Sequence, residues 1–311
     1  MELRPELLRQ SWFLAGPTGS GKSATAVALA KRIDAEIISL DSMAIYRGMD
    51  IGTAKPSRDE MADVPHHLID VADPHEEFSV AEFVRLASDA AESILLRRKR
   101  PLFVGGTGLY LRSILRGIFE GPEADWEFRR EMEQKALANG PRWLHEQLAA
   151  VDQVTAERLH FNDMRRMIRA LEVFHLTGRP LSDEHHNLPR PVDEQPQVVV
   201  WLEPPREWLR KRIDLRVDQM MAAGWLDETR ALMNRQPPPS RTACQALGYR
   251  ELMDHLNGRG SLVETVEQIK TATRQFAKRQ HTWFRNLEEC RPISINGKES
   301  SEELAKRILE M

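Results

Sequence analysis

The segment that most constrains the fold of this chain is a glycine-rich run close to its N-terminus. Residues 16–23 match the pattern G-x-x-x-x-G-K-[ST], between an apolar segment typical of a buried strand (11–15) and an alanine-rich segment typical of a helix (24–32). A glycine-rich turn between a strand and a helix aims several backbone N–H groups at one point, where the helix dipole also favours negative charge. The run therefore predicts a phosphate-binding loop, or P-loop, that holds a di- or triphosphate.

Two side chains of this loop extend the predicted anion site. Lys22 adds a positive charge for the terminal phosphate, and the hydroxyl of Ser23 is placed to ligate Mg²⁺. The residues predicted to bind the phosphates are Gly16, Pro17, Thr18, Gly19, Ser20, Gly21, Lys22 and Ser23. The motif alone does not identify the compound that carries these phosphates.

Apolar segments alternate with helical patterns along much of the chain. This alternation predicts an α/β fold, namely a P-loop core with a parallel β-sheet covered by helices. The expected strands, besides 11–15, are 36–40, a minor one at 67–71, 101–104, 197–202 and 292–295. The expected helices of this core, besides 24–32, are 80–98, 205–223, 225–234, 244–256, 262–287 and 301–309.

A central stretch departs from this alternation. Residues 125–177 show only helical signals, and a polar, proline-containing connector follows up to residue 196. We therefore predict an all-helical insertion domain over 120–196. The P-loop core then comprises 1–119 and 197–311.

Composition limits the class of protein. The chain has 311 residues, enough for about two domains, and its net charge of −3 argues against wholesale electrostatic binding of nucleic acid. Its two cysteines form no C-x-x-C motif, which excludes a disulfide framework and a zinc finger and indicates a reducing compartment. Without an apolar N-terminal segment or a run of about 20 apolar residues, we expect a cytoplasmic protein with no membrane partner. Nothing indicates an obligate dimer, so we expect a monomer.

Three features near the predicted sheet edge could carry chemistry. Asp41 follows the second strand, where the crevice of an open α/β sheet lies, and its carboxylate could ligate metal, accept a proton or bind an amine or hydroxyl. Thr107 lies in a Gly-Gly-Thr-Gly turn and could bridge two substrates. Arg212 and Arg216 share a helix face, and an arginine reaching over the P-loop would neutralise a leaving phosphate. A loop cap, a structural turn and a solvated surface are the alternatives.

Two basic stripes suggest a polyanion. Arg165, Arg166 and Arg169 lie on one predicted helix of the insertion. In the segment 262–287, basic residues recur every three or four positions, at Lys270, Arg274, Lys278, His281 and Arg285. Either stripe alone could be ordinary solvated surface. Together, on both sides of a phosphate crevice, they favour a nucleic-acid backbone as partner.

Longer blocks of this sequence resemble the bacterial tRNA dimethylallyltransferase (tRNA isopentenyltransferase) family. The matching blocks, in the family's order, are 16–23, 41–56, 65–70, 105–110, 169–173, 248–251 and 278–285. The resemblance implies that the P-loop binds the pyrophosphate of dimethylallyl diphosphate. It also implies transfer of the dimethylallyl group to the N6 amine of the adenosine 3′ of the anticodon (position 37), in tRNAs that read codons starting with U. The products would be N6-(dimethylallyl)adenosine and diphosphate.

The resemblance also assigns residues. Asp41 matches the acid that binds the amine and takes its proton, Thr107 the threonine between the two substrates, and Arg216 the arginine over the pyrophosphate. Arg129 matches a basic position on the tRNA side. The segments that match tRNA contacts are Asp41, Ser42, Met43 and Ala44; Arg165, Arg166, Met167, Ile168 and Arg169; Gln245, Ala246, Leu247, Gly248, Tyr249 and Arg250; and Lys278, Arg279, Gln280, His281, Thr282, Trp283, Phe284 and Arg285. Ala44 replaces a common Gln, so we expect any contact made by that side chain to be lost.

Two other functions fit the motifs. A P-loop kinase of a nucleoside or small metabolite would also place an acid after the second strand, glycines after the third and arginines in a lid. A non-catalytic RNA-binding protein could use the P-loop as a nucleotide sensor.

Overall fold

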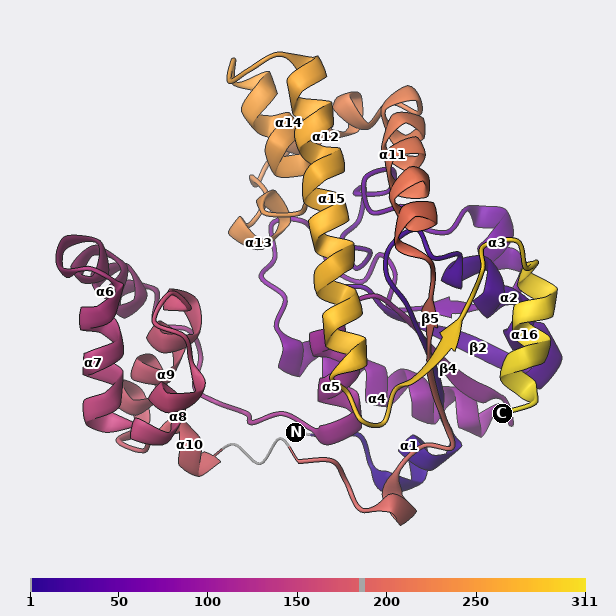
Figure 1. Cartoon of the computed structure of the whole chain (residues 1–311), viewed down its shortest axis with the longest axis horizontal. Helices are drawn as coiled ribbons and strands as arrows, with labels where there is room; N and C mark the ends of the chain where they lie inside the picture. Colours follow the sequence, from indigo (N-terminus) through magenta and orange to yellow (C-terminus); the bar gives the residue numbers. More distant parts are fainter. Residues whose placement is uncertain (1, 185–187) are drawn as a thin grey trace. The chain divides into compact units, whose positions relative to one another are not determined.

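The computed structural model describes residues 2–184 and 188–311. Its internal contacts divide the chain into two compact units (Figure 1). The larger unit comprises residues 2–117 and 189–311, and the smaller unit comprises residues 118–188.

The larger unit is built on a six-stranded sheet of order β3-β2-β4-β1-β5-β6, in which every described strand pair is parallel. The strands are β1 (Trp12–Ala15), β2 (Ala35–Leu40), β3 (His66–His67), β4 (Arg100–Gly105), β5 (Val198–Glu203) and β6 (Arg291–Ser294). All residues of β2 and all but the last of β5 are buried, as expected for strands covered on both faces. The predicted α/β class with a parallel sheet is therefore confirmed.

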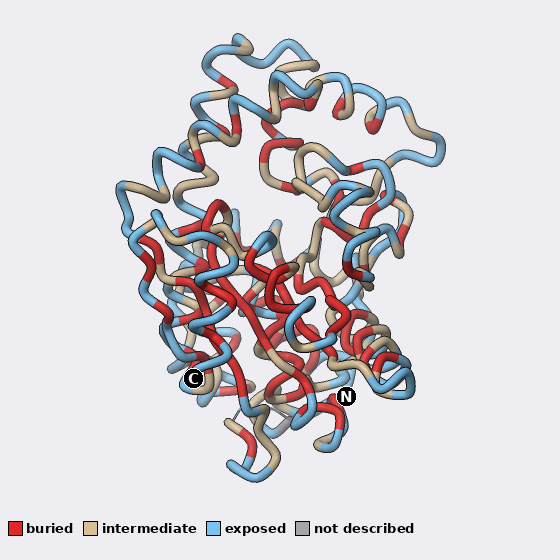
Figure 2. Tube along the Cα trace, turned by 90° about the vertical axis from the view of Figure 1, so that its right-hand side faces the viewer, coloured by how far each residue is buried: buried red, intermediate tan, exposed pale blue. Residues whose placement is uncertain are grey.

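Helices cover this sheet. On one side α2 and α16 pack on the strands, in a core that includes Leu14, Leu29, Val200 and Ile308. Figure 2 shows buried residues concentrated along the strands and the helices packed on them. The helices of the larger unit nearest the sheet are α1 (Pro5–Gln10), α2 (Lys22–Ile33), α3 (Arg58–Asp63), α4 (Val80–Leu96), α5 (Gly108–Arg116) and α16 (Ser301–Leu309), with a 3-10 turn at Val192–Glu194.

A second core joins the loop after β2 to the helices that follow β5. Tyr46 and Met49 from this loop are buried against Val217, Trp225 and Tyr249. The helices are α11 (Arg206–Ala222), α12 (Trp225–Met233), α13 (Arg241–Cys244), α14 (Tyr249–Leu256) and α15 (Leu262–Arg285). Packing of this kind fixes the segment 41–56 beside the carboxyl ends of the strands.

The smaller unit is helical. It contains α6 (Trp126–Asn139), α7 (Pro141–Val151), α8 (Gln153–Arg158), α9 (Met164–Thr177) and α10 (Leu181–Glu184), and its own core includes Met132, Leu144, Leu148, Met167 and Leu171. Its span of 118–188 differs from the predicted 120–196 mainly at the C-terminal end. Residues 189–196 belong to the larger unit because Arg190 is buried there, donating to the carbonyl of Leu3 and pairing with Glu2.

Local structure differs from the sequence predictions at three kinds of place. The helix predicted over 244–256 is broken, because Gly248 adopts a φ of 88° between α13 and α14. The strand predicted over 67–71 is limited to β3, since Leu68 and Asp70 have left-handed backbones. Helices α1, α3, α5, α10 and α13 were not predicted. Throughout the described ranges, no helix is both long enough and apolar enough to cross a bilayer.

Candidate active site

The P-loop occupies the turn between β1 and α2. Gly19 and Gly21 have φ angles of 81° and 90°, a region that glycine adopts without steric cost. A Cβ at Gly19 would also lie 3.3 Å from the side chain of Ile213. No side chain caps the N-terminus of α2, so its first N–H groups remain directed toward the turn. This is the backbone arrangement that an anion requires.

Strand register brings the other predicted residues to the same edge of the sheet. Ala15 and Leu40 both align with Gly105, so β1, β2 and β4 end side by side. A Cβ at Gly105 would lie 2.4 Å from the carbonyl oxygen of Leu40, so only glycine permits this approach. The residues that follow these strands therefore meet around one cavity.

A cavity of about 410 Å³ opens at this edge, wholly within the larger unit. Its walls include Lys22 and Ser23 from α2, Asp41 after β2, Thr107 after β4 and Arg216 on α11. Apolar walls come from Ile213, Val217, Met220, Trp225 and Phe276. The structure thus brings together the residues predicted to hold the phosphates and to carry chemistry, beside an apolar surface.

Two of the cations that line this cavity, Lys22 and Arg216, lie close enough to repel each other. Among the described residues neither Lys22 nor Arg216 forms an ion pair, and the ammonium of Lys22 contacts only the carbonyl of Pro17 at 3.5 Å. Burial and the nearby Arg216 lower the pKa of Lys22 to about 8, against an opposing effect of Asp41. Burial also lowers the pKa of Arg216. Two partly buried cations that repel each other and lack an ion-pair partner favour the binding of an anion in this cavity.

Asp41 has one oxygen fixed and one open. Its Oδ1 accepts hydrogen bonds from the backbone N–H groups of Met43 (2.8 Å) and Ala44 (3.2 Å). Its Oδ2 has no partner within the described part of the chain. An oriented carboxylate with one open oxygen can bind an amine and accept its proton.

Thr107 connects the loops after β2 and β4. Its backbone N–H donates to the carbonyl of Leu40 at 3.1 Å, and its Oγ1 accepts from the N–H of Ser42 at 3.2 Å. The Thr107 hydroxyl and Asp41 are therefore held by a common set of backbone bonds.

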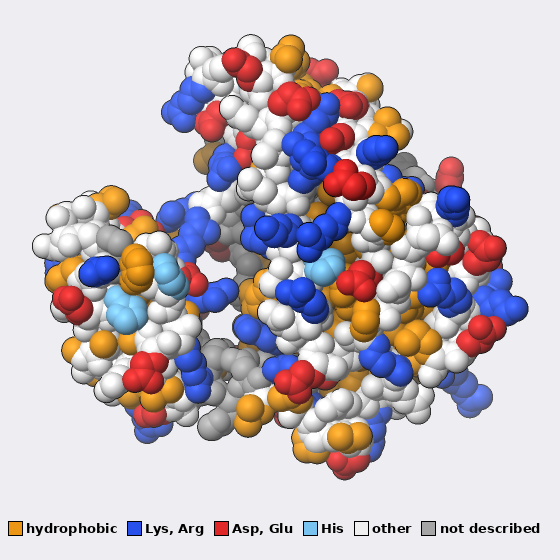
Figure 3. All heavy atoms as spheres, in the orientation of Figure 1, with side chains coloured by type: hydrophobic (Ala, Val, Ile, Leu, Met, Phe, Trp, Pro, Cys, Tyr) orange, Lys and Arg blue, Asp and Glu red, His pale blue; other side chains and the backbone are white. Residues whose placement is uncertain are grey.

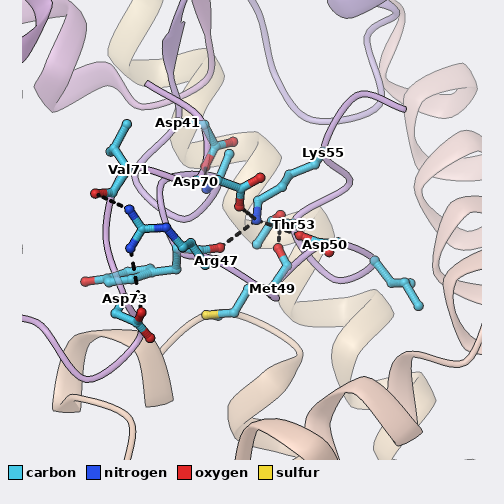
Figure 4. A network of polar contacts seen from close by, with 12 residues as sticks. Asp41, Arg47, Met49, Asp50, Thr53, Lys55, Asp70, Val71 and Asp73 are labelled. Atoms are coloured by element: carbon cyan, nitrogen blue, oxygen red, sulfur yellow. Dashed lines mark hydrogen bonds and ion pairs between the residues drawn. The ribbon is translucent and has the colours of Figure 1, made fainter. Parts of the chain in front are cut away.

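The segment 41–56 folds around a buried lysine (Figure 4). The side chain of Lys55 is only 5% exposed, and its ammonium contacts the carbonyl of Tyr46 and the carboxylates of Asp50 (2.6 Å) and Asp70 (2.5 Å). In contrast to Lys22, its charge is neutralised within the protein. Lys55 therefore stabilises the loop that presents Asp41.

Glu228 on α12 is a further support that the sequence analysis missed. Its carboxylate accepts hydrogen bonds from the backbone of Asp50, Ile51 and Gly52 and from the hydroxyl of Tyr249. A Cβ at Gly52 would lie 2.0 Å from Trp225, so the loop lies directly on the helices. No local pattern distinguishes this glutamate from other helix acids. Only the tertiary fold reveals its role.

Several side chains in the segments predicted to contact tRNA are buried. They are Ala44, Met167, Ile168, Ala246, Tyr249, Gln280 and Phe284, each at most 5% exposed. Their side chains expose little surface, and Ala44, Ala246, Tyr249 and Gln280 also line the cavity. That these residues contact tRNA stays a prediction.

In the smaller unit, two predicted tRNA-binding arginines are paired internally. Arg129 and Arg169 both contact Glu172, which is fully buried and also accepts from the N–H of Asp125. Burial would raise the pKa of Glu172, but hydrogen bonds from the two arginines lower it. The exposed cations of α9 are Arg165 and Arg166, the latter 3.3 Å from Asp163.

The basic stripe on α15 divides into a paired and an open part. Lys270 contacts Asp218, Arg274 contacts Asp214, and His281 lies 3.1 Å from Glu203. The second part consists of the exposed residues Lys278, Arg279 and Arg285. Figure 3 shows Lys and Arg side chains gathered on the face of the larger unit that carries α15. This open part is available to a polyanion.

The protein donors near Ser23 bear on the predicted magnesium site. No cluster of three His, Cys, Asp or Glu side chains in the described residues can hold a metal ion. The hydroxyl of Ser23 lines the cavity beside Lys22 and Asp41, and such oxygens suit Mg²⁺. The donor set thus fits an ion that takes most of its ligands from a bound diphosphate and water, and it does not fit one held by protein alone.

Comparison with known proteins agrees with this geometry. A family model described as IPP transferase matches residues 44–287, and one described as isopentenyl transferase matches residues 10–74. A protein of Geobacter metallireducens named tRNA dimethylallyltransferase is 49% identical over 289 residues, covering 92% of this chain and 93% of that protein. One of Pelobacter propionicus, named tRNA dimethylallyltransferase 1, is 48% identical and covers 88% of both.

Two solved structures are also similar to this chain. The tRNA isopentenylpyrophosphate transferase of Bacillus halodurans has a TM-score of 0.71 and 39% identity, covering 97% of this chain and 95% of that one. A eukaryotic dimethylallyltransferase, described in crystallographic snapshots as acting on tRNA, has a TM-score of 0.77 and 28% identity, covering 96% of this chain and 77% of that one. The chain therefore belongs to the tRNA dimethylallyltransferase family of enzymes.

Proposed function

We propose that this chain transfers a dimethylallyl group from dimethylallyl diphosphate to the N6 amine of adenosine 37 in tRNA. The observation that carries the proposal is the cavity in which two unpaired cations, Lys22 and Arg216, lie with the open carboxylate of Asp41. Such a cavity suits a diphosphate at one end and an amine at the other. The names of the relatives, tRNA dimethylallyltransferase, support both substrates.

The first part of the reaction is departure of the diphosphate. The bond between the allylic C1 and the diphosphate oxygen breaks, and that oxygen keeps the electron pair. Lys22, Arg216 and the N–H groups at the start of α2 neutralise the developing charge in a buried setting, where such contacts are strongest. Ser23 would hold Mg²⁺, which when bound supplies further positive charge to the diphosphate.

The second part is attack by the adenine amine. A bond forms between N6 and C1, and the proton lost from N6 passes to Oδ2 of Asp41, the oxygen that the backbone leaves open. Thr107 lies beside Asp41 on the connected loop and orients the two substrates. The base must first leave the anticodon-loop stack, at a cost of a few kcal/mol.

Contacts with the phosphates of the tRNA backbone offset that cost. We assign them to Lys278, Arg279 and Arg285 on α15 and to Arg165 and Arg166 on α9, which are exposed.

The kinase interpretation is not favoured, because the names of the relatives describe prenyl transfer. One incubation tests the proposal against both alternatives. The protein is incubated with unmodified tRNA, Mg²⁺ and dimethylallyl diphosphate or ATP, and the digested nucleosides are analysed by mass spectrometry. We expect N6-(dimethylallyl)adenosine with the prenyl diphosphate alone. ATP hydrolysis dependent on a small hydroxylated acceptor would indicate a kinase, and tRNA binding without a covalent product would indicate a binding protein.

A further inference from the structure

One side chain joins the two glycine-rich turns of the active site. Gln280 lies on α15 and is only 5% exposed. The N–H of Thr18, in the P-loop, donates to its Oε1 over 2.9 Å. Its Nε2 donates to the carbonyl of Gly106, immediately before Thr107, over 2.9 Å. The side-chain amide of Gln280 thus connects the P-loop to the turn that carries Thr107.

The chemistry of these two bonds is specific to an amide. An N–H faces Oε1 and a C=O faces Nε2, so the side chain must offer one acceptor and one donor in a fork. A carboxylate would place a lone pair against the Gly106 carbonyl. An apolar side chain would leave both backbone groups unpaired in a buried setting, and such loss costs more than the bond itself.

The surrounding backbone permits this close approach only because it is glycine. A Cβ at Gly106 would lie 2.3 Å from Nε2 of Gln280, whereas every other neighbouring residue is at least 3.4 Å away. A Cβ at Gly108 would lie 2.8 Å from the ring of Trp283, one turn further along α15. The helix therefore lies directly on the 105–108 turn, with Gln280 as the polar contact.

We propose that Gln280 is a positioning residue that sets the spacing between the P-loop and the Thr107 turn. Through this spacing it sets the affinity of the P-loop for a diphosphate. It acts through the backbone, because both polar atoms of its amide are engaged there. The inference rests on the proposed function, since it assumes that the cavity binds a diphosphate. Lys278 and Arg279, on the same turn of α15, are exposed. This turn therefore carries both exposed cations and the side chain that supports the P-loop.

The first test compares two Gln→Met variants on the same helix. Gln280→Met keeps the length of the side chain and removes both bonds, whereas Gln268→Met changes an exposed residue. Titration calorimetry with inorganic pyrophosphate and Mg²⁺ measures the affinity of the P-loop for a diphosphate in the absence of turnover. We expect Kd for pyrophosphate to rise about tenfold in Gln280→Met, in line with loss of a buried hydrogen-bonded pair, and to stay within twofold in Gln268→Met. The affinity for tRNA should not change in either variant.

The second test changes Gly106, the residue whose carbonyl accepts a hydrogen bond from Gln280. Gly106→Ala should displace the Gln280 amide and raise the pyrophosphate Kd about fivefold, because its methyl group occupies the position of Nε2. In a Gln280→Ala background that space is empty, so the same change should add less than twofold. Non-additivity of this kind reports a direct interaction.

The possible outcomes distinguish an error in the proposed function from an error in the role assigned to Gln280. If wild-type protein binds neither pyrophosphate nor dimethylallyl diphosphate, the proposed function is wrong. If wild type binds and Gln280→Met binds equally well, or if Gly106→Ala has the same effect in both backgrounds, the role of Gln280 is wrong while the function stands. A general loss of packing would lower tRNA and pyrophosphate affinity together, which also contradicts the positioning role.

Discussion

The active-site cavity and the helical insertion differ in how their partly buried cations are paired. In the cavity, Lys22 and Arg216 have no ion-pair partner among the described residues, and burial lowers the pKa of both. In the insertion, Arg129 and Arg169 share the fully buried carboxylate of Glu172. A cation without a partner costs stability and is retained where a ligand supplies the missing charge. The contrast indicates which basic residues serve a ligand and which serve the fold.

The insertion should show the largest effect on stability. Glu172→Ala leaves two arginines facing a site from which the counter-charge has gone, and we expect a loss of about 3 kcal/mol, at the low end for a broken buried pair because both arginines are partly exposed. Hydrogen exchange of the α6 and α9 amides measures the loss within this unit. Glu131→Ala, which breaks an exposed pair with Lys135, should change exchange little. Equal effects of the two variants would contradict the structural role of Glu172.

The single open carboxylate of the cavity should show the largest effect on rate. Asp41→Asn keeps Oδ1 for the Met43 and Ala44 N–H groups but cannot accept a proton. We expect kcat to fall roughly 10²-fold or more, the usual scale of general acid–base assistance, with little change in tRNA affinity. Single-turnover kinetics with saturating dimethylallyl diphosphate give the measurement. Unchanged turnover would remove Asp41 from the reaction.

The contrast between paired and unpaired cations shows which features of the fold and the site could be predicted from the sequence. The P-loop, five of the strands and the cavity residues Asp41 and Thr107 were predicted because each depends on a local pattern or on the edge at which parallel strands end. The helical pattern placed Arg212 and Arg216 on one face, and only the resemblance to the family singled out Arg216. Arg129 and Arg169 carry the same charge as open cations, so sequence could not tell that Glu172 neutralises them. Gln280 likewise needs Thr18 and Gly106, which lie far away along the chain.

The charge state of Lys22 should link diphosphate binding to pH. Its pKa of about 8 means that the ammonium is charged below that pH and neutral above it. Binding of dimethylallyl diphosphate in the absence of tRNA should therefore take up a proton above pH 8, and Kd should be about tenfold weaker at pH 9 than at pH 7. Calorimetry in two buffers of different ionisation enthalpy measures the uptake. Lys22→Met should abolish it; uptake that persists in this variant would assign the proton to another group.

The smallest predicted effect lies on α15, where one helix carries both kinds of cation. Lys278 is exposed, whereas Lys270 is held by Asp218 (2.8 Å) and Glu267 (3.0 Å). Lys278→Ala should weaken tRNA binding only a few-fold and reduce the slope of log K against log[salt] by about 0.7–1, because one phosphate contact is lost. Lys270→Ala should leave that slope unchanged, since its charge is already neutralised. If both variants changed the slope equally, pairing within the protein would not decide which cations meet the RNA, and the contrast between cavity and insertion could not be extended to this helix.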